Sequence, residues 1–337
     1  MKKYSQSLHQ KGVTLIELLV SMVIGMVIVG TIIGLYVNTS SARRQSVAAA
    51  EMNEDGLYAL KVLTTHIRLA GYNPIRPDRA STGTVITPLS NPFPTPTLAV
   101  FGCDKGFSNG IRNSGAFSAT QSFQITCNTG TATAAAAIAI TYEADRYNTV
   151  PTSSNTPTDC LGNGLQQTSW TNSDGSKSGF FYIAENRIYV SGNELFCTGN
   201  GGGATSTFSI GQSIVQNVED LKFTYGMLVP STAAGTGTAT ATARSTVVAG
   251  YLTGDQVGNA SGTDGAAEAS LTSKSAADRW GSVATVRICV LMRSATQVLS
   301  QPQDYQGCDL SQNVTTNNTD RYLRRAFVTT VNVRNTR

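Results

Sequence analysis

The longest apolar stretch of the chain lies close to its amino terminus. From residue 13 to residue 37 the sequence reads VTLIELLVSMVIGMVIVGTIIGLYV, which is 25 residues with a single charge, Glu17. A helix rises about 1.5 Å per residue, so this segment would reach roughly 37 Å and cross a hydrocarbon core of about 30 Å. It is longer than the roughly 7 to 15 apolar residues of an ordinary signal peptide. The pattern predicts a membrane-spanning helix over 13–37.

The pattern then becomes one-sided, which predicts that the helix continues over 38–72. Its apolar side chains recur every three to four positions, at Leu57, Leu60, Leu63, Ile67 and Ala70. Such spacing lays one apolar stripe on a folded domain. Gly71 is a helix-stop signal, and Pro74 and Pro77 follow it. We therefore expect one helix of up to about 58 residues, apolar all round at first and amphipathic later.

The remainder of the chain, 73–337, predicts a β-rich globular domain. Branched and aromatic residues favour strands, and they cluster at Ser122–Cys127, Ala137–Tyr142, Phe180–Ala184, Arg187–Val190, Leu221–Tyr225, Val283–Met292 and Leu323–Val333. Within FFYIAENRIYV we expect a hairpin that turns at Glu185 and Asn186. Loops around 198–208, 231–246 and 253–279 are poor in large apolar residues and are expected at the surface. The expected fold class is α+β, with the long helix packed on an antiparallel β-rich domain.

Charged residues are sparse and unevenly placed. They make up 14% of the chain, below the roughly 25% that is typical of soluble proteins. Lys2, Lys3 and Lys11 precede the apolar segment with no acid among them, which predicts a cytoplasmic amino terminus and a globular domain outside. The formal net charge is +4, and removing these three lysines leaves +1. A general nucleic-acid-binding surface is therefore not indicated.

The interpretations of the amino-terminal segment differ in whether they account for Glu17. A secretory signal peptide cleaved after Ala48–Ala50, or a plain membrane anchor, accounts for the apolar run. Neither accounts for an acid, unless Glu17 simply reaches the interface from its place near the helix end. A carboxylate in a membrane helix costs about 2.5 to 3.5 kcal/mol and usually marks a function. A partner of opposite charge would relieve that cost and favour one register of packing.

The sequence Gly12-Val13-Thr14-Leu15-Ile16-Glu17, after a short basic leader over 1–12, resembles the prepilin signal of type IV pilins and type II secretion pseudopilins. The resemblance implies that prepilin peptidase cuts between Gly12 and Val13 and that Val13 becomes N-methylated. Thr14, Leu15 and Ile16 then belong to the assembly segment. Glu17 would be the fifth residue of the mature chain and would meet the amino-terminal amine of a neighbouring subunit. Val13 departs from the commoner phenylalanine or methionine, which bears on methylation.

Further motifs resemble the PilW type of minor pilin, namely HIRLAGY, IVQNVEDLKFTYG, VRICVLMRS and LRRAFVTTVNVRN. The resemblance implies a type IV pilin-like fold and a role in the assembly or initiation of type IV pili, which serve adhesion and twitching motility. It implies a single-pass inner-membrane protein with a periplasmic globular domain. The implied partners are other minor pilins, the major pilin, prepilin peptidase, the inner-membrane assembly platform and a tip adhesin. The alternative in the same superfamily is a J-type pseudopilin of type II secretion.

Six cysteines are spread widely through the chain: Cys103, Cys127, Cys160, Cys197, Cys289 and Cys308. None lies in a CxxC pair or close to a histidine, so disulfides in an oxidising compartment are favoured over a zinc site. Sequence alone leaves about fifteen pairings open. We favour the pairing of neighbours along the chain, and each such ring would contribute on the order of 3 kcal/mol.

The sequence offers no catalytic constellation. The only histidines are His9 and His66, so a serine triad or a histidine-ligated metal is not available in the globular domain. The glycines over 201–203 lack the lysine of a phosphate-binding loop. Glu219 and Asp220 begin an expected strand, where we expect them to be solvated. We predict a protein that is not an enzyme and carries no cofactor or metal.

Basic residues gather at the carboxyl terminus, namely Arg321, Arg324, Arg325, Arg334 and Arg337. Arginines near aromatic residues on a strand can contact nucleic-acid phosphates, so a DNA-uptake minor pilin is a second alternative. The favoured interpretation is that these arginines lie at the ends and outer face of a strand. Its inner face would then carry Leu323, Phe327 and Val331.

Overall fold

The computed structural model describes residues 12–74, 80–81, 84–85, 99–108, 125–130, 134–171, 177–202, 208, 210–228, 248–259, 276–309 and 313–333. Its helices are α1 (Leu15–Leu69), α2 (Gly254–Asn259) and α4 (Ala276–Trp280). Its strands are β1 (Ala80–Ser81), β2 (Thr84–Val85), β3 (Val100–Cys103), β4 (Ala137–Ala144), β5 (Gln167–Thr171), β6 (Lys177–Ser191), β7 (Glu194–Gly199), β8 (Gln212–Gln216), β9 (Val218–Leu228), β10 (Val248–Leu252), β11 (Val283–Arg293), β12 (Tyr305–Gln306), β13 (Asn313–Val314) and β14 (Arg324–Asn332).

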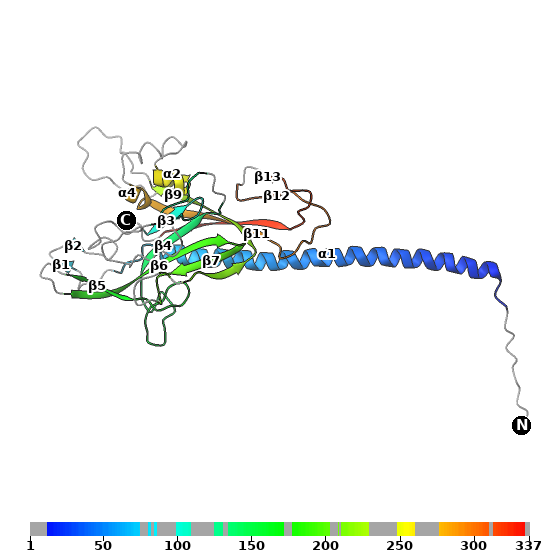
Figure 1. The fold of residues 1–337 in the computed structure, drawn as a ribbon, viewed down its shortest axis with the longest axis horizontal. Coiled ribbons are helices and arrows are strands. Elements are labelled where there is room, and N and C mark those ends of the chain that lie inside the picture. The colour runs from blue at the N-terminus through cyan, green and yellow to red at the C-terminus, as the bar shows by residue number, and fades with distance from the viewer. Residues whose placement is uncertain are drawn as a thin grey trace, which may run out of the picture.

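The predicted α+β class is confirmed. In Figure 1 the amino-terminal half of α1 extends away from the β-rich part of the molecule, and its other half lies against that part. The helix ends at Leu69, three residues before the predicted limit at 72, and the predicted stop residue Gly71 follows it with a φ of 70°, a conformation that glycine adopts without strain. The chain is then tied to the sheet, since the backbone N–H of Gly71 donates to the carbonyl of Thr141.

Two antiparallel sheets form the globular part among the described residues. One has the strand order β10-β9-β11-β14, and the other has the order β3-β4-β6-β7-β8, with β5 paired to β6. The chain passes from β8 to β9 through the single residue Asn217, which adopts a φ of 61°. Asparagine tolerates this left-handed conformation better than most residues, so the abrupt change of sheet is made at little cost.

The core lies between α1 and the two sheets. Its largest fully buried side chains include Tyr142, Phe181 and Tyr225 from the strands and Leu63 and Ile67 from α1. In β11 the even-numbered residues from Val286 to Met292 are buried and Arg287 is exposed, as the alternation in VRICVLMRS predicted. The core joins α1 and both sheets into one cluster.

The hairpin expected at Glu185 and Asn186 is wrong. Both residues lie inside β6, which continues without interruption from Lys177 to Ser191. The polar side chains do not break the strand because Arg187 Nε donates to Glu185 Oε1 at 2.8 Å and the pair is buried together. The turn falls at Gly192 and Asn193, which adopt φ values of 59° and 65°. Positive φ at both central residues is the requirement of a two-residue hairpin turn.

Other strand limits also differ from expectation. The strand expected over Ser122–Cys127 lies partly outside the described residues, and from 125 onward the backbone forms only an isolated bridge between Phe107 and Cys127. The expected segments Phe180–Ala184 and Arg187–Val190 are one strand. The sequence did not indicate β3, β5, β7, β8 or β10. The expected surface loops include three ordered elements, since β7 ends at Gly199, α2 occupies Gly254–Asn259 and α4 begins at Ala276. The loop expected over 231–246 lies outside the described residues.

Candidate functional site: the projecting half of α1

The amino-terminal half of α1, called the projecting half, does not pack against the rest of the chain. Its large apolar side chains are exposed all round, from Leu15 at 84% to Tyr36 at 73%. By length and composition α1 could cross a membrane, and its most apolar stretch is not buried against the rest of the chain. Apolar surface of this extent is unfavourable in water, so membrane lipid or another protein must cover it.

Glu17 lies in the first turn of this exposed helix. Thr14 precedes the helix with an extended backbone, and its carbonyl accepts hydrogen bonds from the backbone N–H groups of Glu17 and Leu18. Among the described residues no side chain pairs with the Glu17 carboxylate, and Ile16 beside it is 71% exposed. An acid near the helix amino terminus is favourable for the helix dipole. It remains available for a partner outside the chain.

The serine and threonine hydroxyl groups at positions 21, 31 and 39 of the projecting half are satisfied within the helix. Ser21, Thr31 and Thr39 each donate to the backbone carbonyl four residues earlier, at 2.7 to 2.8 Å. Unsatisfied polar groups are costly in an apolar surrounding. This half of α1 is therefore compatible with lipid apart from Glu17.

Glycines in the two halves of α1 have different surroundings. A Cβ atom added to Gly30 or Gly34 would meet nothing within 4 Å, whereas a Cβ on Gly56 would lie 2.5 Å from the Phe327 ring. Gly56 is thus required for the close approach of α1 to β14. The spacing of Gly30 and Gly34 would permit a similarly close approach by a helix of another subunit.

The carboxyl-terminal half of α1 is fixed to the sheets by a narrow stripe. Its buried residues are Met52, Gly56, Ala59, Leu63 and Ile67. Beside this stripe, Arg325 donates to Asn53 Oδ1 at 2.8 Å, which links β14 to α1. The packed half holds the projecting half in a fixed direction relative to the globular domain.

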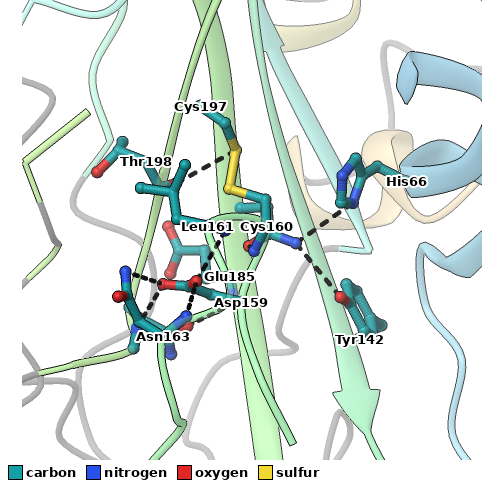
Figure 2. Close-up of a disulfide and its surroundings, with 12 residues drawn as sticks. His66, Tyr142, Asp159, Cys160, Leu161, Asn163, Glu185, Cys197 and Thr198 are labelled. Carbon is teal, nitrogen blue, oxygen red and sulfur yellow. Dashed lines mark hydrogen bonds between the residues drawn. A yellow bond between two sulfur atoms is a disulfide. The ribbon is translucent and has the colours of Figure 1, made fainter. Parts of the chain in front are cut away.

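A buried polar cluster connects the end of α1 to a disulfide. Figure 2 shows the disulfide between Cys160 and Cys197 with His66 and Tyr142 to one side. Asn186 Oδ1 accepts from the backbone N–H of Cys160 at 3.0 Å, so its amide nitrogen faces Tyr142 and His66. That nitrogen lies 3.5 Å from His66 Nδ1, which can only act as an acceptor there. Burial lowers the pKa of His66 from 6.5 to about 4, so the ring is neutral at neutral pH.

The loop that carries Cys160 is held by Asp159. Its Oδ1 accepts from the backbone N–H groups of Leu161 and Asn163, and its Oδ2 accepts from Gly201. Figure 2 shows Asp159 and Asn163 on the side of the disulfide away from His66. The Asp159 carboxylate therefore fixes the conformation of this loop.

The structure joins the six cysteines as the neighbouring pairs Cys103–Cys127, Cys160–Cys197 and Cys289–Cys308. This is the pairing favoured above from position along the chain. Each disulfide ties a residue of a strand, in β3, β7 or β11, to a residue outside the named strands, and the ring it closes limits the unfolded chain. Three disulfides are typical of an oxidising compartment.

The three described carboxyl-terminal arginines, Arg321, Arg324 and Arg325, have different surroundings. Arg324 is 5% exposed and binds Glu219 at 2.6 Å and Asp320 at 2.7 Å. Glu219 was expected to be solvated, and this pairing corrects that expectation. Arg325 contacts α1, Arg321 is exposed, and Arg334 and Arg337 lie outside the described residues.

This arrangement bears on the DNA alternative. Two carboxylates already bind the guanidinium of Arg324, so this residue is not free to contact a phosphate of DNA. Arg324 is therefore no longer proposed as a DNA contact. Phe327 and Val331 are buried as expected for the inner face of β14. Most of β14 therefore contributes to packing within the fold.

Metal-binding clusters do not occur in the described part of the chain. No group of three His, Cys, Asp or Glu side chains there is placed to hold a metal ion. His66 is occupied with Asn186 at the helix end, and the buried Glu185 is paired with Arg187. Burial raises the pKa of Glu185, and Arg187 opposes that rise. These groups stabilise the fold.

Comparison with known families matches both ends of the chain. Residues 180–335 match the family described as type IV pilus-assembly protein W, or PilW. Residues 7–33 match the prokaryotic N-terminal methylation motif. A search of curated proteins gives no significant match.

Among solved structures, a type IV-like pilin from Thermus thermophilus matches at 8% identity. The match covers 61% of this chain and 81% of that chain, with a TM-score of 0.27, which is too low to carry an argument. Pilin-type proteins are structural and non-enzymatic in general, and they interact with other pilins and the pilus machinery. A methylation motif on the exposed apolar helix and a PilW match from β6 to β14 together support a PilW-type minor pilin of the type IV pilus.

Proposed function

We propose that this protein is a minor pilin that takes part in the assembly or initiation of type IV pili, at the tip or in the priming complex. The observation that carries the proposal is the projecting half of α1, which is apolar, exposed and marked by one unpaired acid. A chain of 337 residues is large for the repeating subunit of a filament. A terminal position places the fewest neighbours around its bulky domain.

The proposed maturation follows from the methylation motif. Prepilin peptidase removes residues 1–12 by cutting after Gly12, and Val13 becomes the N-methylated first residue. The globular domain lies in the periplasm until α1 leaves the inner membrane for the filament. Thr14, Leu15 and Ile16 enter the packed helical core together with Glu17.

Glu17 sets the register of packing in this proposal. Its carboxylate is unfavourable among apolar helices unless a positive group lies beside it, and the amino-terminal amine of a neighbouring subunit supplies that group. The proposed partners are other minor pilins, the major pilin, the inner-membrane assembly platform and a tip adhesin.

Substitution of Glu17 tests the function. Glu17→Gln keeps the size of the side chain and removes its charge, and we expect piliation of a strain that carries only this variant to fall strongly. Ser21→Ala is the matched control, because that hydroxyl bonds only to the carbonyl of its own helix. Normal numbers of pili with the Glu17→Gln variant would contradict the role given to this acid.

The pseudopilin of type II secretion is the nearest rival, since it would carry the same helix. Co-purification from membranes separates the two. Recovery with pilins supports the proposal, and recovery with components of the secretion apparatus alone would overturn it.

A further inference from the structure

The sheet β10-β9-β11-β14 ends at β14, and the outer edge of this strand is open within the described part of the chain. There β14 pairs with β11 alone, along its whole length of 9 residues and without a register shift. Two hydrogen bonds at its ends show which way its peptide groups point. The backbone N–H of Val333 donates to the carbonyl of Ala284, and the carbonyl of Leu323 accepts from the N–H of Ser294.

The odd-numbered residues of β14 therefore direct their peptide groups toward β11. Successive peptide groups of a strand alternate in direction, so the even-numbered residues direct theirs away from the sheet. These outward-facing residues are Ala326, Val328, Thr330 and Asn332, and the last three are exposed. A row of unpaired N–H and C=O groups at a sheet edge is a template for a further strand.

The other sheet edges are short or interrupted. β8 and β10 have 5 residues each, and both pair with their neighbours across a register shift. β3 has 4 residues and is approached by α2, since a Cβ on Gly254 would lie 2.8 Å from the carbonyl oxygen of Gly102. Such devices keep native edges from pairing with other chains. β14 lacks them, because it is regular and carries neither proline nor charge over 326–333.

Apolar side chains lie on both faces of the open edge. Phe327 faces α1, so the next side chain, Val328, lies on the opposite face of the sheet, where it is 40% exposed. On the α1 side, Asn53 contacts Arg325 of β14. Leu57 follows Asn53 by four positions, lies on the same side of the helix and is 62% exposed. A strand added to this edge would therefore find apolar contacts on both of its faces.

Arg325 adds a positive charge at the start of the edge. Its side chain is exposed, and one of its N–H groups donates to Asn53 Oδ1. Among the described residues no carboxylate forms an ion pair with it, in contrast to Arg324. The guanidinium has five N–H donors, so it can also bind a carboxylate of a partner.

The direction of β14 determines which chain can pair with it. Arg325 lies beside Asn53, and Phe327 lies beside Gly56, so β14 and α1 run the same way. Two copies inserted in one membrane hold their α1 helices parallel. Their β14 strands would then also be parallel and could not form an antiparallel pair. The occupant of an antiparallel ladder at this edge must therefore be a different protein.

We infer that the outer edge of β14 docks an extended segment of a different protein, which continues the sheet as an antiparallel strand. The segment carries apolar side chains at alternate positions and an acidic residue opposite Arg325. Backbone hydrogen bonds supply affinity in such strand addition, and the side-chain contacts supply selectivity. The inference rests on the proposed function in one step, because insertion in one membrane excludes the second copy.

Proline substitutions at two adjacent threonines separate docking from folding. Thr330→Pro removes an N–H that β11 does not use and places the proline ring where the added strand would lie. The unfolding midpoint should stay nearly unchanged. Thr329→Pro removes an N–H that faces β11 and should lower the midpoint strongly. Thr330→Val keeps the N–H and is the matched control.

Photo-cross-linking of the full chain in native membranes, which hold the other pilins, tests the inference. A benzophenone amino acid is placed at Val328 or at Asn332, and the cross-linked peptides are identified by mass. We expect both probes to reach one short segment of another protein, at residues about four positions apart and in reverse order. Thr330→Pro should lower both yields about tenfold, and Thr330→Val should change them by less than about twofold.

A charge substitution tests the acidic residue of the partner. Arg325→Glu should lower the yields about threefold, whereas Arg321→Glu, an equal change of charge at another exposed arginine, should not. Cross-links to a second copy, partner residues in the same order or in none, or no cross-link would each overturn the inference. Equal yields for Thr330→Pro and Thr330→Val would do so as well. The mass of the amino terminus in the same samples reports prepilin processing, so failure of the proposed function is observed separately.

Discussion

The two halves of α1 belong to one continuous helix but are stabilised by different surroundings. Leu63 in the packed half is fully buried, whereas Leu35 in the projecting half is 63% exposed. The packed half has one apolar stripe and the projecting half is apolar on every side. A helix buries the faces that its sequence makes apolar. The projecting half must therefore be completed by lipid or by other subunits, which is the property expected of an assembling protein.

The same substitution made in each half should separate the two environments most strongly. Leu63→Ala leaves a cavity between α1 and the sheets and should lower the free energy of unfolding by about 3 kcal/mol. Leu35→Ala should change it by less than about 0.5 kcal/mol, because that side chain touches nothing else in the chain. Denaturant unfolding in detergent can be followed through Trp280, which is buried against Tyr225. Equal losses for the two variants would contradict the division of the helix.

Glycine substitutions sharpen the same comparison with a smaller effect. Gly56→Leu drives a side chain into the Phe327 ring and should cost about 2 kcal/mol even after the gain in helix propensity. Gly34→Leu meets no atom of the chain and should leave unfolding unchanged or slightly improved. Cooperative unfolding at an unaltered midpoint for the Gly56→Leu variant would show that α1 packs elsewhere.

One part of the pH dependence of stability should come from His66 in the packed half. Because the pKa of His66 is lowered to about 4 in the folded chain, the unfolded state binds its proton first as pH falls. The contribution is complete above about pH 6.5 and declines between about pH 6.5 and 4, by on the order of 1 kcal/mol near pH 5 for this half-buried ring. His66→Gln should remove that part of the slope. An identical slope in the variant would contradict the neutral, buried state of the ring.

The periodicity of apolar residues predicted those parts of the fold that local sequence patterns determine. The approximate length of α1 and its end shortly before Gly71 followed from apolar spacing and a stop signal, and β11 followed from simple alternation. The error at Glu185 arose because an acid and an amide indicate a turn unless a partner buries them. From the sequence, Arg187 could be recognised as a polar residue but not as the partner of Glu185. The glycine and asparagine at 192–193 were the available signal for the true turn.

The only features of the candidate site that could be predicted were those visible in the sequence without knowledge of long-range contacts. Glu17 is conspicuous as the one charge in an apolar run, and the cysteines are conspicuous by number. The contact of Asn186 with His66 and the binding of Arg324 by Glu219 join residues more than one hundred positions apart. The need for glycine at position 56 depends likewise on the place of Phe327. Such contacts depend on topology, which local patterns do not determine.

The mass and sequence of the mature amino terminus, taken from the native membrane fraction, test prepilin-type assembly most directly. We predict a chain that begins at N-methylated Val13 and retains Glu17 as its fifth residue. A chain that begins after Ala48–Ala50, without the projecting half of α1, would contradict assembly through that helix and leave a secreted β-rich domain.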